Sequence, residues 1–567
     1  MSCTSVQSIL LAGILTGVAV AHAEEPQHAG HMMQFGTMPT ASAATPAGSE
    51  VQLWEGLGPT AFAITTEDAT AQSYFNQGLV FAYGFNHWEA QRAFQAAQKL
   101  DPECAMCFWG EALVLGPNIN WPMETAAIAP AFKAAQDAQR LAPNASAKEQ
   151  ALIAALAKRY AADEAADRIA LDIAYADAMH EVVARFPDDL DVATLYAEAL
   201  MDLSPWNYWG EDGETPTGRT AELIAALERV LKANPDHIGA IHLYIHAVEA
   251  SATPKRAEPY ADRLAAQNLS TGHLIHMPAH IYFRVGRYLD SLAANKVAVA
   301  ADESYLVQVE AGGIYPYAYY PHNVHFVLVS AQMAGETATV LEAAEKLDKI
   351  VTEDAVRAVP LAQPVKAAPL FAYAQFSPPE KVLSLPSPAD DLPYLKGVWH
   401  YARGVAHAAK GDVAAAQAEA DAIAAIGAAT DFSSLSVYGI PAADVLELAR
   451  HVVLARAAQA GGELQTAIGE FEAAAEIEGK LPYMEPAYWY YPVKQSLGAA
   501  LLLAGETDRG EAALQESLEA TPNNGWACFG LLEAARRRGD TAAAASLEER
   551  LGRTWAGDPA LLDLSRL

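Results

Sequence analysis

The chain has 567 residues, 52% of them hydrophobic, so it is too long for one compact core and long enough for several core-bearing units. Its formal net charge is −32 at pH 7, and a chain this acidic repels phosphate backbones and anionic membrane surfaces. Nucleic acid is therefore not an expected partner. Alanine is abundant, leucine and glutamate are common, and no long alternating β-branched run competes with them. The composition predicts an all-α protein.

An apolar run over residues 9–20 is too short to span a bilayer. The sequence Ala21-His22-Ala23 follows it and matches the small-x-small pattern that precedes signal-peptidase cleavage. We therefore expect residues 1–23 to be a signal peptide, with export to a periplasm or beyond and no stable membrane insertion after cleavage. No Lys or Arg precedes the apolar run, so an uncleaved anchor stays open as an alternative.

Residues 24–71 are rich in Ala, Thr, Pro and Gly and lack helical periodicity, which predicts a low-complexity, mostly disordered segment. Its early histidines and methionines are His28, His31, Met32, Met33 and Met38. Such residues suit copper capture, but they also occur without function in disordered tails.

Helix-turn-helix units punctuated by Gly and Pro recur along the rest of the chain. The clearest unit runs through residues 496–500, turns at Gly505 and ends at Pro522. Small residues let two helices approach closely, and proline cannot continue a helix. This pattern resembles the tetratricopeptide repeat (TPR) family. The resemblance implies an α-solenoid whose first helices line a concave groove, which usually binds an extended peptide or a partner helix.

The repeats fall into two predicted arrays, an N-terminal one over residues 72–350 and a C-terminal one over residues 393–567. Between them, residues 351–392 form a Pro-rich connector, since the stretch from Val359 through Pro393 carries eight prolines, Pro393 included. We expect this connector to be a linker or an irregular packing segment.

Histidines fall into register when the repeats are aligned on their turns. If Gly286 is one turn, histidines lie 6, 10 and 13 residues before it. When Ala252 and Gly335 are also taken as turns, the positions 6, 10 and 13 residues before them hold four more histidines. Seven of the nine positions so defined are histidine: His242, His246, His273, His276, His280, His322 and His325.

Helix geometry gives this spacing a chemical meaning. Residues three or four apart share a helix face, and packed helices lie about 8–10 Å apart, so imidazoles from neighbouring helices can share one ion. Imidazole-rich sites suit Cu, Zn, Ni or Fe. We expect one shared volume, with His273 and His322 at its edge and these residues inside it: His242, His246, His276, His280 and His325.

Two other interpretations of the histidines stay open. They could be polar groove residues that bond to backbone or to tyrosine hydroxyls, for which residues 315–320 supply candidates. They could also recognise an anionic ligand. Pro278 lies within the helix that carries His276 and His280, and it should kink that helix or lie in its first turn.

Further candidate ligands lie toward the N-terminus. Cys104, Cys107 and Glu111 occupy the equivalent columns if Pro117 marks a turn. The Cys-x-x-Cys spacing suits a disulfide in an oxidising compartment, buried free thiols, or metal and redox chemistry.

The sequence thus predicts an exported TPR scaffold with a transition-metal site in its N-terminal groove and a protein or peptide partner. The first alternative is a metal-dependent hydrolase or oxidoreductase, with Glu249 or Glu198 as general base on a metal-bound water. The second is a plain peptide-binding scaffold without metal.

Overall fold

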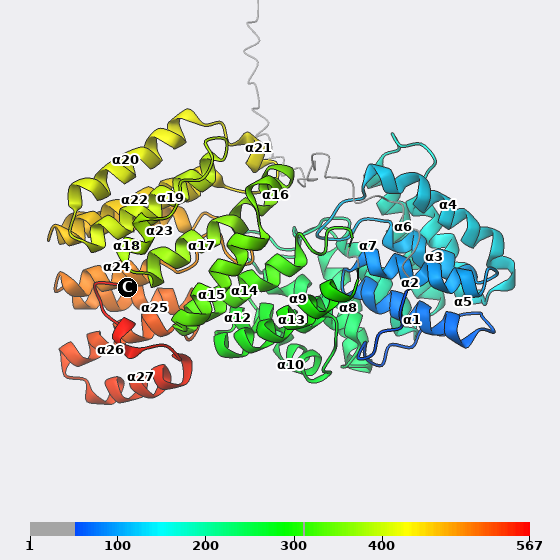
Figure 1. Ribbon diagram of the computed structural model, residues 1–567. Helices are drawn as coiled ribbons and strands as arrows, with labels where there is room; N and C mark the ends of the chain where they lie inside the picture. The colour runs from blue at the N-terminus through cyan, green and yellow to red at the C-terminus, as the bar shows by residue number, and fades with distance from the viewer. Residues whose placement is uncertain (1–50, 310–311) are drawn as a thin grey trace, which may run out of the picture.

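The protein is an all-α, TPR-like solenoid, seen here in a computed structural model that describes residues 51–309 and 312–567 (Figure 1). Within these ranges there is no strand, only two isolated bridges, Asn118 with Trp121 and Trp209 with Pro216. The predicted signal peptide and residues 24–50 lie outside the described residues. No helix in the described ranges is long and apolar enough to cross a membrane.

The N-terminal helices form the end of the molecule that is coloured blue to cyan in Figure 1. They are α1 (Ala69–Tyr83), α2 (His87–Leu100), α3 (Ala105–Val114), α4 (Thr125–Leu141), η1 (Ala142–Asn144), α5 (Ala147–Leu156), η2 (Ala157–Arg159), α6 (Arg168–Arg185), α7 (Leu190–Met201) and α8 (Thr220–Ala233).

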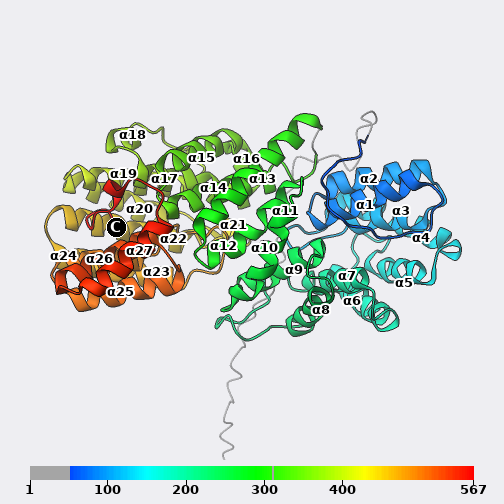
Figure 2. The same cartoon turned by 90° about the horizontal axis from the view of Figure 1, so that it is seen from below.

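The central helices, green in Figures 1 and 2, lie between the two ends of the solenoid. They are α9 (Ile238–Glu249), η3 (Pro254–Ala257), α10 (Glu258–Ala266), α11 (Gly272–His276), α12 (Pro278–Arg284), α13 (Tyr288–Gln308), α14 (Tyr319–Ala334), α15 (Thr337–Ile350), α16 (Glu353–Ala358), η4 (Pro360–Ala362), α17 (Gln363–Phe376) and α18 (Pro379–Leu383).

The C-terminal helices complete the solenoid. They are α19 (Pro393–Ala409), α20 (Val413–Ala429), α21 (Ser433–Ser436), α22 (Ala442–Ala460), α23 (Leu464–Glu478), α24 (Val493–Leu503), α25 (Thr507–Ala520), α26 (Gly525–Arg538), α27 (Thr541–Thr554) and η5 (Pro559–Leu561).

Consecutive helices pack as pairs, and small residues at the crossings set their spacing. Gly78 on α1 and Gly110 on α3 both lie against the ring of Phe94 on α2, where an added Cβ would approach within 2.7 Å and 2.4 Å of that ring. Side-chain caps begin many of the helices, such as Asp68 before α1 and Asn86 before α2.

Two segments are more ordered than the sequence suggested. Residues 51–68 pack against α1 and α5, with Phe62 buried and the Thr65 amide donating to Glu149 at 2.6 Å. The Pro-rich connector contains α16, η4, α17 and α18, and Phe371 on α17 lies in the C-terminal hydrophobic core. Prolines at first-turn positions explain this outcome, since they need no amide partner there.

The C-terminal helices lie directly against the central ones. Gly286, at the turn between α12 and α13, has φ +77° and lies so close to Pro522 that an added Cβ would clash with its carbonyl. The Asn523 side chain donates to the Gly286 carbonyl at 3.3 Å. The Ala556 amide donates to the Ala334 carbonyl at 2.9 Å. Later parts of the chain therefore pack directly against the turn after α12 and the end of α14.

Candidate metal centre

Helix α9 carries His242 and His246 one turn apart, and every residue of this helix is buried. Such a helix, apolar apart from its histidines and Glu249, belongs in the interior. His242 Nδ1 contacts the carbonyl of Tyr83, and the His246 Nδ1–H donates to Glu249 Oε1 at 2.7 Å.

The next histidines lie on both sides of a helix break. Helix α11 ends at His276 and α12 begins at Pro278, so proline occupies a first-turn position, as the sequence allowed. The break does not separate the two rings, because the Nε2 atoms of His276 and His280 are 2.6 Å apart.

Helix α14 supplies His322 and His325, which point to different places. His322 Nε2 lies 3.1 Å from His276 Nε2 and 3.5 Å from His280 Nε2. His325 instead has its Nε2 2.8 Å from the hydroxyl of Tyr490, in the C-terminal array. The sequence predicted His325 inside the shared volume and His322 at its edge. Both placements are wrong, because His322 lies among the clustered rings and His325 lies outside them.

The six remaining histidines form two groups of three, each with ligand nitrogens within 4.8 Å of one another. We name them the first histidine group, which is His276, His280 and His322, and the second histidine group, which is His242, His246 and His273. The groups are neighbours, since the ring centroids of His246 and His280 are 5.3 Å apart and those of His273 and His276 are 5.7 Å apart.

Hydrogen bonds at Nδ1 orient four of these rings. His276 Nδ1 lies 2.5 Å from Asn295 Oδ1, and because the amide nitrogen of Asn295 donates to the Ser291 carbonyl, His276 must be the donor. His280 Nδ1–H donates to Glu249 Oε2 at 2.7 Å and also contacts Glu485. His242 and His246 also make their contacts to Tyr83 and Glu249 through Nδ1. The Nε2 atoms of these four rings are therefore available to a ligand.

Burial sets the charge of the cluster. It lowers the pKa of His242, His273 and His276 well below the ordinary value, and that of His246 and His322 to about 3. These rings are therefore neutral and able to ligate.

His280 differs from its neighbours. Burial alone would lower the pKa of His280, but the carboxylates of Glu249 and Glu485 raise it to about 10. Burial, together with the nearby Glu249 carboxylate, raises the pKa of Glu485 to about 7. Two carboxylates thus supply negative potential beside the first histidine group.

Some buried ring nitrogens have no hydrogen-bond partner within the described residues. They are His246 Nε2, His273 Nδ1 and His325 Nδ1. A buried polar atom without a partner costs about 1–3 kcal/mol, so each one needs an explanation. For His246 the free atom faces the second histidine group, where a cation would satisfy it.

Sequence reasoning missed the residues that close the cluster. Glu485 and Tyr483 come from the segment between α23 and α24, and the Tyr483 hydroxyl donates to Glu249 Oε2 at 3.0 Å. Asn295 lies on α13, a second helix of its pair. No local pattern marks Glu485 and Tyr483, because they meet the histidines only through packing of segments more than 200 residues apart.

Aromatic side chains enclose both groups. Phe326 packs on all three rings of the first histidine group, with centroid distances of 4.8–5.0 Å. Phe85 covers the second, 4.5 Å from the His242 ring. Phe85 has φ +53°, an uncommon backbone conformation for a bulky residue, and such strain concentrates at functional sites. It also lines a cavity of about 110 Å³ together with His87 and Trp88.

The other predicted site residues lie elsewhere. Cys104 and Cys107 form a disulfide at the start of α3, so neither offers a thiolate to a metal. Glu111 accepts hydrogen bonds from three glutamine side chains, among them Gln95 at 2.6 Å.

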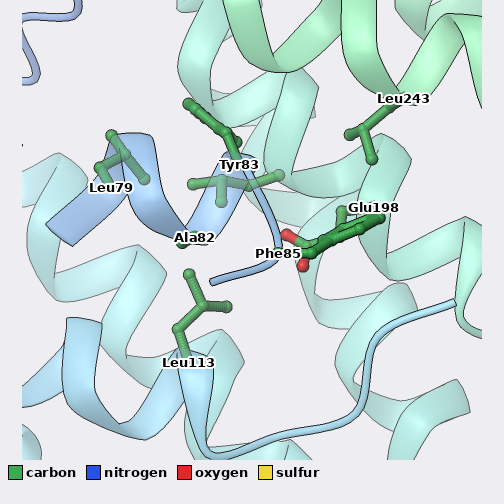
Figure 3. Close-up of a pocket in the computed structure, with 8 residues that line it drawn as sticks. Leu79, Ala82, Tyr83, Phe85, Leu113, Glu198 and Leu243 are labelled. Carbon is green, nitrogen blue, oxygen red and sulfur yellow. The ribbon is translucent and has the colours of Figure 1, made fainter. Parts of the chain in front are cut away.

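The two predicted general bases also have other roles. Glu198 lies beside Phe85 in a small cavity with Tyr83 and Leu113 and is in neither histidine group (Figure 3). Burial raises the pKa of Glu198 although Arg159 opposes that shift. Glu249 accepts hydrogen bonds from His246 and His280 and orients both rings.

Comparisons with known proteins find only distant structural likenesses. No family model matches the chain, and no curated protein matches it. A human IFIT1 dimer with m7Gppp-AAAA is 12% identical, covering 87% of this chain and 91% of that one, with a TM-score of 0.32. The APC/C hetero-tetramer Cut9-Hcn1 is 14% identical over 88% and 89%, and yeast Tom70 is 12% identical over 87% and 93%, each with a TM-score of 0.28. These distant likenesses carry no inference about function.

Proposed function

We propose that this protein is a helical binding scaffold that holds a transition-metal ion at the first histidine group. The observation that carries the proposal is the convergence of three Nε2 atoms, separated by 2.6, 3.1 and 3.5 Å. Metal–nitrogen distances of about 2.0–2.1 Å give a tetrahedral site edges of about 3.3–3.4 Å. The separations of 3.1 and 3.5 Å are close to such edges, whereas the 2.6 Å between His276 and His280 would have to widen when an ion binds.

The surroundings support a cation better than the alternatives. An anionic ligand would meet five neutral imidazoles and the carboxylates of Glu249 and Glu485, and these carboxylates already balance the charged ring of His280. A peptide in the groove would need an exposed surface, yet His276 and His280 are at most 1% exposed. The same carboxylates that favour a charged His280 would offset the charge of an ion bound to its Nε2.

A metal-dependent enzyme is the second candidate, and one observation favours it. Each histidine group offers three nitrogens, which leaves one position of a tetrahedral site for water or substrate. If bound water needs a base, Glu485 joins Glu249 as a candidate, because the pKa of Glu485 is raised to about 7.

We also propose export and a protein or peptide partner on the solenoid surface. Export is supported by the apolar run over residues 9–20 with its Ala-His-Ala sequence, and the Cys104–Cys107 disulfide fits an oxidising compartment. N-terminal sequencing of the exported protein should find Glu24 first, whereas an intact Met1 on cytoplasmic protein would contradict export.

Elemental analysis tests the metal proposal. Protein purified without chelators should retain a transition metal through gel filtration, and His276→Ala/His322→Ala should lower its content. His400→Ala/His451→Ala is the matched control, since those histidines pair with Glu419 and Glu470 outside the cluster. Equal metal content in both variants, with helical circular dichroism retained, would refute the assignment.

A further inference from the structure

The second histidine group has the features of a site in its own right. His242 Nε2 and His273 Nε2 are 3.2 Å apart, and His246 Nε2 is buried without a hydrogen-bond partner in the described residues. All three rings are at most 2% exposed. The first histidine group uses none of these three atoms, so one ion there would still leave His246 Nε2 buried without a partner among the described residues.

A single carboxylate links the two groups. Glu249 Oε1 accepts from His246 Nδ1, and Glu249 Oε2 accepts from His280 Nδ1, both at 2.7 Å. Glu249 itself is 0% exposed. One side chain therefore orients a ring of each group, as expected of a residue that supports two adjacent ions.

The charge of the cluster bears on the kind of ion. The carboxylates in contact with its histidine rings are Glu249 and Glu485, which together offset at most two positive charges. Two divalent ions held by neutral imidazoles would leave a buried excess of positive charge, which is costly, whereas two monovalent ions would be balanced. Among the metals that imidazole prefers, copper has a stable monovalent state.

We propose that the protein binds two copper ions as Cu(I), one in each histidine group. This inference rests on the proposed function, because it assumes that the first histidine group binds metal. The two groups would then act as a pair, with Glu249 as the positioning residue between them and with Phe326 and Phe85 excluding water from either side.

Stoichiometry tests the pair directly. Metal-free full-length mature protein is titrated anaerobically with Cu(I) in the presence of bicinchoninate, and copper per chain is measured after desalting. The wild-type chain should retain two ions. His242→Ala/His273→Ala and His276→Ala/His322→Ala should each retain one, and His400→Ala/His451→Ala should retain two.

The outcomes separate this inference from the proposed function. One ion in the wild-type chain would overturn the pair and leave a single metal site standing. Two zinc ions retained in preference to copper would overturn the assignment to copper. No retained metal of any kind would overturn both. The decisive number of bound ions is measured on the wild-type chain, so a variant that fails to fold cannot save the two-ion proposal. The corresponding double His→Gln variants provide a second set of measurements.

Discussion

Glu249 on α9 accepts the Nδ1–H of His280 on α12 at 2.7 Å, and neither side chain is exposed to solvent. The contact joins two repeats 31 residues apart and leaves His280 Nε2 directed at His276. A buried carboxylate in this position orients an imidazole and raises its basicity.

Replacing this carboxylate should weaken metal binding without removing a ligand. In Glu249→Gln the amide oxygen can accept from only one ring, so either His246 or His280 loses its hydrogen bond to residue 249, and His280 is then held by Glu485 alone. We expect affinity to fall roughly 10–100-fold, as measured by competition with a chelator. Glu258→Gln, which alters a half-exposed ion pair with Arg287, is the control, and an equal loss there would contradict the role of Glu249.

His325 should matter for stability and not for metal. Its Nε2 bonds the Tyr490 hydroxyl at 2.8 Å and joins α14 to the C-terminal array. His325→Ala should lower the free energy of unfolding by about 1–3 kcal/mol in urea denaturation, with metal content unchanged. His322→Ala should show the reverse pattern. Loss of metal in the His325 variant would restore the original prediction for that residue.

Phe85 should control access to the second histidine group. Its ring lies on His242 and lines the adjacent cavity of about 110 Å³. Phe85→Ala should therefore let a chelator extract metal from this group several-fold faster in stopped-flow measurements, and should cost about 3–5 kcal/mol of stability. Phe471→Ala, buried in the C-terminal array, should cost similar stability and leave extraction unchanged. The same acceleration in both variants would show general loosening instead.

Asp302 should make stability depend on pH. Burial raises the pKa of Asp302 to about 7 from an ordinary 3.8, although Tyr315 and Asn323 donate hydrogen bonds to it. Between these pH values the folded state holds a proton on Asp302 that the unfolded state has lost. The free energy of unfolding is therefore highest below about pH 4 and falls as the pH rises to about 7. The fall amounts to roughly 4 kcal/mol.

Asp302→Asn should remove that dependence. The new amide can bond Asn323 if that side chain turns round, because Asn323 Oδ1 has no partner within the described residues. The difference in unfolding free energy between wild type and variant should change across pH 4–8 in metal-free protein. A difference that stays constant across this pH range would refute the assignment to Asp302.

The repeat architecture could be predicted because its signals are local. The glycines taken as turns, Gly286, Gly335, Gly411 and Gly505, all have φ between +76° and +83°, a conformation that favours glycine. The 34-residue step from Ala252 to Gly286, one TPR period, also aligned His242 and His246 with His276 and His280, which lie together in the structure.

The rest of the site depends on how helices rotate and how the chain closes. His322 and His325 are three residues apart on α14 and lie on neighbouring parts of its surface. The rotation of α14 about its axis decides which of the two enters the cluster, and sequence periodicity does not give that rotation. Glu485 reaches His280 across 205 residues of sequence. Periodicity carries no information about such contacts, and the disulfide that removed Cys104 and Cys107 was one of several outcomes their spacing allowed.

An anomalous difference map tests the central claim most directly. Crystals of protein purified without chelators should show a peak at the absorption edge of the bound metal, about 2.0–2.1 Å from the Nε2 atoms of His276, His280 and His322. A well-ordered cluster in which those three nitrogens contact only one another or water, with no anomalous peak after exposure to copper, zinc, nickel and iron, would contradict the account.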